Sequence, residues 1–207
     1  MKNIRLTLIS FLLGFGSLVF GQDQDSDIKY IFKNNTDLKG FGTIEMKLSD
    51  ILNETGLLIG GNGGVTVNKY FLFGAGGYGI VTKTTVPGTN PDEPLRLYGG
   101  YGGLMIGFNL FPREVVHLSF PILIGAGNID IVDENFFSNS FDQDFTVERS
   151  AFFVAEPGVL LEINVTSFFH LGLGASYRYI DGLNMANINS SDLTDWSGNV
   201  SFKFGGY

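Results

Sequence analysis

Eight stretches of this chain alternate apolar residues with small or polar ones at a period of two. In the last stretch, Val200, Phe202 and Phe204 fall on one face, while Ser201 and Lys203 fall on the other. Side chains of a β-strand alternate in this way, and no stretch carries the spacing of a long amphipathic helix. The sequence therefore predicts an all-β fold with strands at 40–48, 56–68, 70–84, 95–110, 114–130, 150–165, 169–182 and 195–206.

The connections between the expected strands alternate in length. The short ones are centred on 68–69, 111–113 and 166–168, and the longer ones cover 49–55, 85–94, 131–149 and 183–194. Short turns at one end and long polar loops at the other are typical of outer-membrane barrels. We therefore expect an eight-stranded antiparallel up-and-down transmembrane β-barrel.

Composition excludes several other classes of protein. The 207 residues include 29 Gly and 20 Phe, only 16% are charged, and the formal net charge is −8. High aromatic content with few charges does not fit disorder, and an acidic chain is a poor partner for nucleic acid. The absence of cysteine excludes disulfides, thiolate metal sites and a cysteine nucleophile.

The N-terminus has the layout of a secretory signal peptide. Lys2 and Arg5 precede an uncharged apolar run at 6–20, and cleavage is expected near Gly21. Fifteen apolar residues are short for a spanning helix, although a retained N-terminal anchor stays open as the alternative. We expect a signal peptide at 1–21, a polar leader at 22–39 and a barrel at 40–207, which reaches the outer membrane through the periplasm.

Periodicity alone does not decide which face of each strand points outward, and a soluble secreted barrel would bury the apolar faces. The other face mixes charges with Gly and Ser, which suits the narrow interior of an eight-stranded barrel. Aromatic residues also gather near the expected strand ends, as membrane-interface girdles do. These aromatic residues are Tyr70, Tyr98, Phe111, Phe168, Phe169, Tyr177, Tyr179 and Trp196. We therefore expect the apolar faces to contact lipid.

Two details of the strand pattern stay open. Residues 70–84 are apolar on both faces, so their register is undetermined. Asn62-Gly63 is a strong hairpin signal inside the expected strand 56–68, and a turn there would give ten strands.

Charged residues on the inward faces form the main candidate site. A turn centred on Ser167 would place Glu156 opposite Arg178, and closure of the barrel would bring Glu45 and Lys47 near Lys203. Buried charges persist when they are paired and hydrogen-bonded. We expect a lumen charge network of Glu45, Lys47, Glu156, Glu162, Arg178 and Lys203 that plugs the lumen, with a selective ion path as the alternative.

Two prolines form a second candidate site. Pro121 and Pro157 lie mid-strand, where proline removes a ladder hydrogen bond, and the hairpin centred near residue 139 places them almost opposite each other. They predict a strand-seam defect, which is either a pair of bulges or a lateral opening for an apolar ligand.

Catalytic and metal sites have little support, and we expect no enzyme, no cofactor and no metal. His117 and His170 fit no metal-binding spacing, and Ser119 shares a face with His117 as neighbouring strand residues commonly do. The acidic loops offer oxygen ligands at Asp133, Glu134, Asp142 and Asp144, but their spacing does not match a calcium loop.

Together, the signal peptide, the eight alternating strands, the unequal connections and the terminal Tyr207 resemble the small outer-membrane barrels of Gram-negative bacteria, of the OmpA/OmpX/OmpW type. The resemblance implies outer-membrane lipid and the barrel-assembly machinery as partners. It implies a structural or surface-interaction role, with a narrow channel or a lateral-opening binder for small apolar compounds as the alternative. An extracellular ligand would bind through loops 85–94, 131–149 and 183–194. Tethering through a following peptidoglycan-binding domain is not expected.

Overall fold

The computed structural model describes residues 36–86, 95–133 and 146–206. The predicted signal peptide and most of the predicted leader lie outside the described residues, as do large parts of loops 85–94 and 131–149. The carboxylates of Asp133, Glu134, Asp142 and Asp144 also lie outside them.

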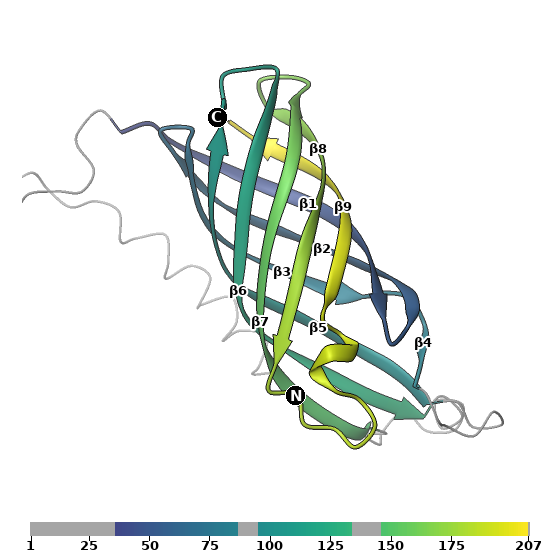
Figure 1. The fold of residues 1–207 in the computed structure, drawn as a ribbon. Helices are drawn as coiled ribbons and strands as arrows, with labels where there is room; N and C mark the ends of the chain where they lie inside the picture. The colour runs from purple at the N-terminus through teal and green to yellow at the C-terminus, as the bar shows by residue number, and fades with distance from the viewer. Residues whose placement is uncertain (1–35, 87–94, 134–145, 207) are drawn as a thin grey trace, which may run out of the picture. The chain divides into compact units, whose positions relative to one another are not determined.

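Antiparallel strands account for nearly all of the described chain (Figure 1). The longest strands are β6 (Val116–Asp133) and β7 (Thr146–Asn164). They correspond to the predicted strands 114–130 and 150–165, and both extend further than predicted toward the loop that joins them. The bounds are β1 (Leu38–Ile51), β2 (Glu54–Val67), β3 (Phe71–Ile80), β4 (Thr84–Thr85), β5 (Leu95–Leu110), β6 (Val116–Asp133), β7 (Thr146–Asn164), β8 (Phe169–Asp181) and β9 (Asp195–Gly205).

The strands close into a barrel. Their order is β3-β2-β1-β9-β8-β7-β6-β5-β4, and β3 also pairs with β5. The two-residue β4 pairs with β5 beyond the end of β3, so it continues that strand and the barrel has eight strands. The alternative of a turn at Asn62-Gly63, which would have given ten strands, is wrong, because β2 continues through these residues and Gly63 pairs with Gly42. The eight-stranded antiparallel prediction is confirmed.

Tight turns join strands at both ends of the barrel. Leu52 and Asn53 have φ values of 56° and 62°, and Asn68 and Lys69 have 51° and 72°. Positive φ at both central residues is the geometry of a type I′ hairpin turn, whose twist matches that of the strands. The prediction of a longer connection at 49–55 is therefore wrong, because the strands continue to Ile51 and resume at Glu54.

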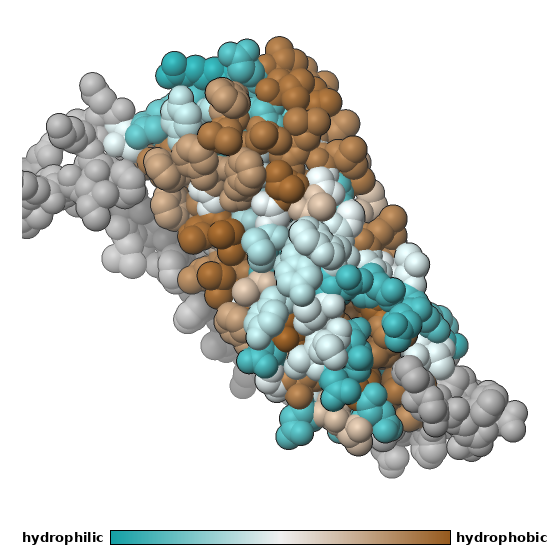
Figure 2. Space-filling view, viewed as in Figure 1, coloured by the Kyte–Doolittle hydropathy of each residue, from teal (hydrophilic) through white to brown (hydrophobic). Residues whose placement is uncertain are grey.

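The apolar faces point outward, as predicted. Leu104, Leu173 and Trp196 are 73%, 64% and 63% exposed, whereas inward polar residues such as Glu156, Ser176 and Lys203 are buried. Figure 2 shows hydrophobic side chains gathered over the upper part of the barrel wall, with hydrophilic residues at the upper rim and around the lower end. The alternative in which a soluble barrel buries these faces is wrong for this fold.

The sequence left open which residues of β3 point inward, and the structure shows that its inner face combines large side chains with glycine. Leu72 and Tyr78 point inward, while Phe71 and Phe73 are exposed. The inner face of β3 carries glycine between these two side chains, and the ring of Tyr78 lies beside that of Tyr101 on β5, with 5.5 Å between the ring centroids.

The interior is layered along the barrel axis. A small apolar group lies toward the end with the short turns, polar and charged side chains fill the middle, and a larger apolar cluster fills the end with the long loops. Residues 182–194, with the short 3-10 helix η3 (Ser190–Asp192), fold over that second end (Figure 1). In the described ranges no helix has the length and apolar character needed to cross a membrane.

Candidate functional site

All six residues of the predicted lumen charge network lie inside the barrel. Each is at most 4% exposed, and they come from β1, β7, β8 and β9. Three of them are acids and three are bases, so their formal charges balance. The members are Glu45, Lys47, Glu156, Glu162, Arg178 and Lys203.

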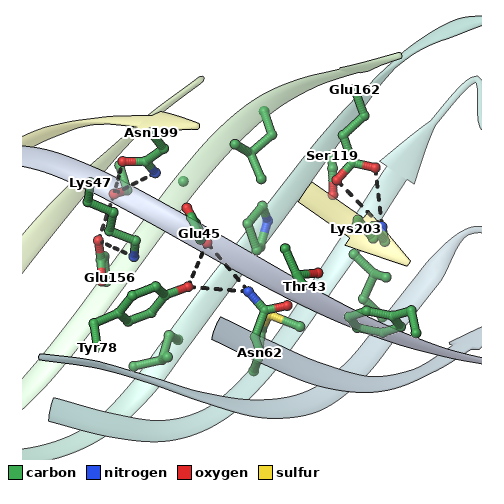
Figure 3. A pocket seen from close by; sticks show the side chains of 18 residues that line it. Thr43, Glu45, Lys47, Asn62, Tyr78, Ser119, Glu156, Glu162, Asn199 and Lys203 are labelled. Atoms are coloured by element: carbon green, nitrogen blue, oxygen red, sulfur yellow. Dashed lines mark hydrogen bonds and ion pairs between the residues drawn. The ribbon is translucent and has the colours of Figure 1, made fainter. Parts of the chain in front are cut away.

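The centre of the network is the ion pair between Lys47 and Glu156. The Lys47 Nζ atom lies 2.8 Å from Glu156 Oε1, and it also lies 3.4 Å from the centroid of the Tyr78 ring (Figure 3). Glu156 accepts two further hydrogen bonds, from the Tyr101 hydroxyl at 2.6 Å and from Ser176 Oγ at 2.6 Å. A buried carboxylate with this many donors is well satisfied.

Glu45 is held by neutral donors. The Tyr78 hydroxyl donates to Glu45 Oε2 at 2.6 Å, and Asn62 Nδ2 donates to the same oxygen at 3.4 Å (Figure 3). Tyr78 thus contacts both Glu45, through its hydroxyl, and Lys47, through the face of its ring.

A second ion pair lies nearer the short-turn end. Lys203 Nζ is 3.2 Å from Glu162 Oε2, and His117 Nε2 lies 3.0 Å from the same oxygen. His170 lies at the rim, where its ring nitrogens contact Asn164 Oδ1 at 2.6 Å and the Gly205 carbonyl oxygen at 3.1 Å. Both histidines therefore have structural contacts within the barrel.

The structure corrects the expected pairing of Glu156 with Arg178. The neighbouring pairs Ala155–Tyr179 and Gly158–Ser176 confirm the predicted register of β7 and β8. The guanidinium nevertheless points toward the long-loop end. Its Nε donates to the Leu193 carbonyl oxygen at 2.8 Å, and its Nη2 donates to Ser49 Oγ at 3.0 Å. Glu156 is instead paired with Lys47, which reaches it across the lumen from β1.

The space left between these side chains is small. A cavity of ≈ 40 Å³ is lined by the central polar residues and by Leu72, Met105 and Leu160. A single water needs about 10–15 Å³ of such volume, so the cavity is large enough for a few waters. The apolar cluster above it leaves only ≈ 10 Å³ beside Arg178 and Leu193.

The two prolines interrupt the ladders on both sides of β7. The pairing of β6 with β7 is broken at Phe120 and Pro121, and that of β7 with β8 is broken at Glu156 and Pro157. The β6–β7 pairs on either side place Pro121 opposite Gly158, and Ile122 pairs with Pro157, so the prolines are offset by one residue. The lateral opening stays a prediction.

Within the described residues, no group of three or more His, Cys, Asp or Glu side chains is arranged to hold a metal ion. Ser119 and His117 are both inside the barrel, at 1% and 2% exposure, where a lipid or peptide substrate does not reach them.

Sequence reasoning missed the neutral partners of the charges, above all Tyr78 and Tyr101. Each stands among glycines, in the segments GAGGYG and GGYGG. A single large polar side chain between small ones on the inward face is a signal for a residue that spans a narrow lumen. For Tyr78, that signal needed the register of residues 70–84, which the sequence left undetermined.

No family model matches the sequence, and no curated protein matches it either. Solved structures do match. Neisserial surface protein A (NspA) has a TM-score of 0.52 at 12% identity, with 83% of this chain and 99% of that chain covered. The N-terminal β-barrel domain of Pseudomonas aeruginosa OprF has a TM-score of 0.48 at 13% identity, with 80% and 96% covered. By its strand number, its closure and its similarity to NspA, this chain has the fold of the small eight-stranded outer-membrane barrels.

Proposed function

We propose that this protein is an integral outer-membrane β-barrel with a plugged lumen and a structural or surface-interaction role. One observation carries the proposal: the barrel wall is apolar on the outside, and a balanced set of six charges is buried on the inside. Such a wall is unfavourable in water but is the lipid-facing surface that a transmembrane barrel requires. Two ion pairs, together with the hydrogen bonds of Glu45 and Arg178, link the strands around these charges.

Aromatic pairs at two levels of the wall support this location. The rings of Phe169 and Phe204 are in tilted contact near the short turns, with centroids 5.3 Å apart, and those of Tyr177 and Trp196 are in tilted contact toward the long loops, with centroids 5.2 Å apart. Phe169 and Tyr177 are both on β8, about 26 Å apart along the strand at 3.3 Å per residue. A strand tilt of roughly 40° reduces this to about 20 Å along the membrane normal, close to the apolar band of known barrels.

The proposed orientation follows from the connections. The end with the connections at 68–69, 111–113 and 166–168 faces the periplasm. The opposite end faces the outside, where loops 85–94, 131–149 and 183–194 are available to an extracellular ligand. Outer-membrane lipid and the barrel-assembly machinery are the partners of this route, with residues 1–21 as the export signal.

A matched pair of charge substitutions tests the membrane location. Leu173 is 64% exposed between the two aromatic levels, and Val115 is 68% exposed in the turn between β5 and β6. In a bilayer, Leu173→Arg is expected to destabilise the folded barrel by about 2–4 kcal/mol, and Val115→Arg by about 0–1 kcal/mol. Urea titration of both variants in phospholipid vesicles, followed by heat-modifiable gel migration, measures the difference.

Equal stability of the two variants would show that Leu173 does not contact hydrocarbon, and the proposal would fail. Recovery of the wild-type chain as a water-soluble periplasmic protein after osmotic shock would contradict it independently.

A further inference from the structure

The long-loop end of the interior is a chamber with apolar walls. The polar middle layer closes it on the side that faces the short turns. Residues 182–194 cover it and contribute two of the side chains that fill it, Ile188 and Leu193, each 1% exposed. The chamber walls are contributed by Ile51, Leu52, Leu58, Val86, Leu97, Ile129, Ile131, Phe152, Val154 and Ile180.

The covering loop is attached to the barrel by hydrogen bonds spread along its length. The Asn184 amide donates to Ser150 Oγ at 2.9 Å, and the Leu52 amide donates to the Asp192 carbonyl oxygen at 3.1 Å. The loop begins at Gly182, whose φ of +82° is a conformation that other residues rarely adopt. The Ala186 amide also donates to Glu148 Oε1, Thr194 exchanges hydrogen bonds with the Ile180 backbone, and Leu183 and Met185 pack against the apolar cluster. The loop has to release these contacts in order to lift.

Arg178 forms part of the chamber floor and is incompletely satisfied. Among the described residues it has no carboxylate within ion-pair distance, whereas Lys47 and Lys203 each have one. Its Nη1 atom is buried without a hydrogen-bond partner, and its side chain lines the ≈ 10 Å³ cavity together with Ile180 and Leu193. A guanidinium stays charged at all physiological pH values, so this donor is available to an anion.

We propose that this chamber binds a small monocarboxylic acid with an apolar chain. When residues 182–194 lift, the Leu193 carbonyl oxygen leaves Arg178 Nε, and the carboxylate accepts hydrogen bonds from the guanidinium in its place. The apolar chain takes the space that Ile188 and Leu193 vacate. The loop is thus a tethered occupant of the site.

The chemistry of the walls selects this class of ligand. One cation at the floor suits one negative charge, and a planar guanidinium matches the two oxygens of a carboxylate. The walls of the chamber above Arg178 are aliphatic and aromatic, so the rest of the ligand must be apolar. The inference concerns the chamber alone and does not depend on a surface-interaction role.

The test uses octanoate as the probe and the full chain in lipid nanodiscs. Calorimetric titration is expected to show octanoate binding. Octanol, which lacks the carboxylate, and acetate, which lacks the apolar chain, are expected to bind at least tenfold more weakly. Octanol binding as tightly as octanoate would overturn the role of Arg178, and absence of octanoate binding would overturn the site.

An engineered disulfide tests whether the loop has to move, because the oxidised and reduced states of one variant can be compared. The contact between Asn184 and Ser150 brings these residues within reach of a disulfide, and the chain has no other cysteine. In the double variant Ser150→Cys/Asn184→Cys, octanoate is expected to bind after reduction and to bind at least tenfold more weakly after oxidation. Equal binding in both states would show that the loop does not have to lift.

Two single variants test separately the guanidinium of Arg178, which would bind the carboxylate, and the loop side chain of Ile188, which fills the chamber. Arg178→Gln is expected to weaken octanoate binding about tenfold to hundredfold and to leave octanol binding unchanged. Ile188→Ala keeps the guanidinium and empties part of the chamber, so it is expected to bind octanoate more tightly than the wild type. Weaker binding by Ile188→Ala would overturn the proposal even if Arg178→Gln fails to fold, and heat-modifiable migration reports folding for both variants.

Discussion

At the scale of single residues, the interior depends on the donors that surround its buried carboxylates. Glu156 accepts from Lys47, Tyr101 and Ser176, so that one carboxylate connects β1, β5, β7 and β8. Removing one partner of a buried ion pair leaves the other charge uncompensated and costs far more than the pair itself contributes. The network therefore makes the register of four strands interdependent.

The isosteric substitution Glu156→Gln is expected to lower the free energy of unfolding by about 3–5 kcal/mol, because Lys47 loses its counter-charge. Asp130→Asn is the matched control, since it breaks the exposed ion pair with Arg149 on the outer surface. That change is expected to cost less than about 1 kcal/mol. Urea unfolding in lipid vesicles compares the two variants, and equal losses would contradict the central role of the buried pair.

At the scale of elements, close backbone approach explains the many glycines of β2, β3, β5 and β6. Gly103 pairs with Gly125, and a Cβ atom on Gly103 would overlap with the Ile124 carbonyl oxygen. A Cβ atom on Gly42 of β1 would meet no atom within 4 Å. Glycine is thus required on one strand and dispensable on another, although both strands belong to the same barrel.

Gly103→Ala is accordingly expected to destabilise the barrel by about 1–3 kcal/mol, the typical cost of overpacking. Gly42→Ala is expected to leave stability within about 0.5 kcal/mol of the wild type. The same urea titration measures both variants. A neutral Gly103→Ala would mean that β5 and β6 can separate without loss.

Strand number, strand order and the inward faces of β6 to β9 were predictable from the sequence, because a period of two fixes which residues share a face. The register of β3 was not, since Phe71, Leu72 and Phe73 give no alternation. The partner of Arg178 was also missed. Opposition on neighbouring strands gives backbone register, whereas a long side chain in a narrow lumen reaches residues on other strands and loops, here Ser49 and Leu193.

At the scale of the whole barrel, the layered interior argues against a permanent pore. The polar middle encloses only ≈ 40 Å³, and the apolar cluster that includes Ile188 and Leu193 closes the long-loop end. Eight strands leave an interior that side chains fill. A hydrated ion would have to displace both the paired charges and the apolar side chains in order to cross.

Planar-bilayer recording is therefore expected to show no steady single-channel current for the wild type, with a large-pore porin as the positive control. The double variant Ile188→Ala/Leu193→Ala opens only the outer chamber and is also expected to stay silent, because the Lys47–Glu156 layer beneath it remains closed. A steady current in the double variant alone would locate the barrier in the apolar layer rather than among the charges. A steady wild-type current that disappears in Glu156→Gln would instead make those charges an ion path, and the plug would have to be abandoned.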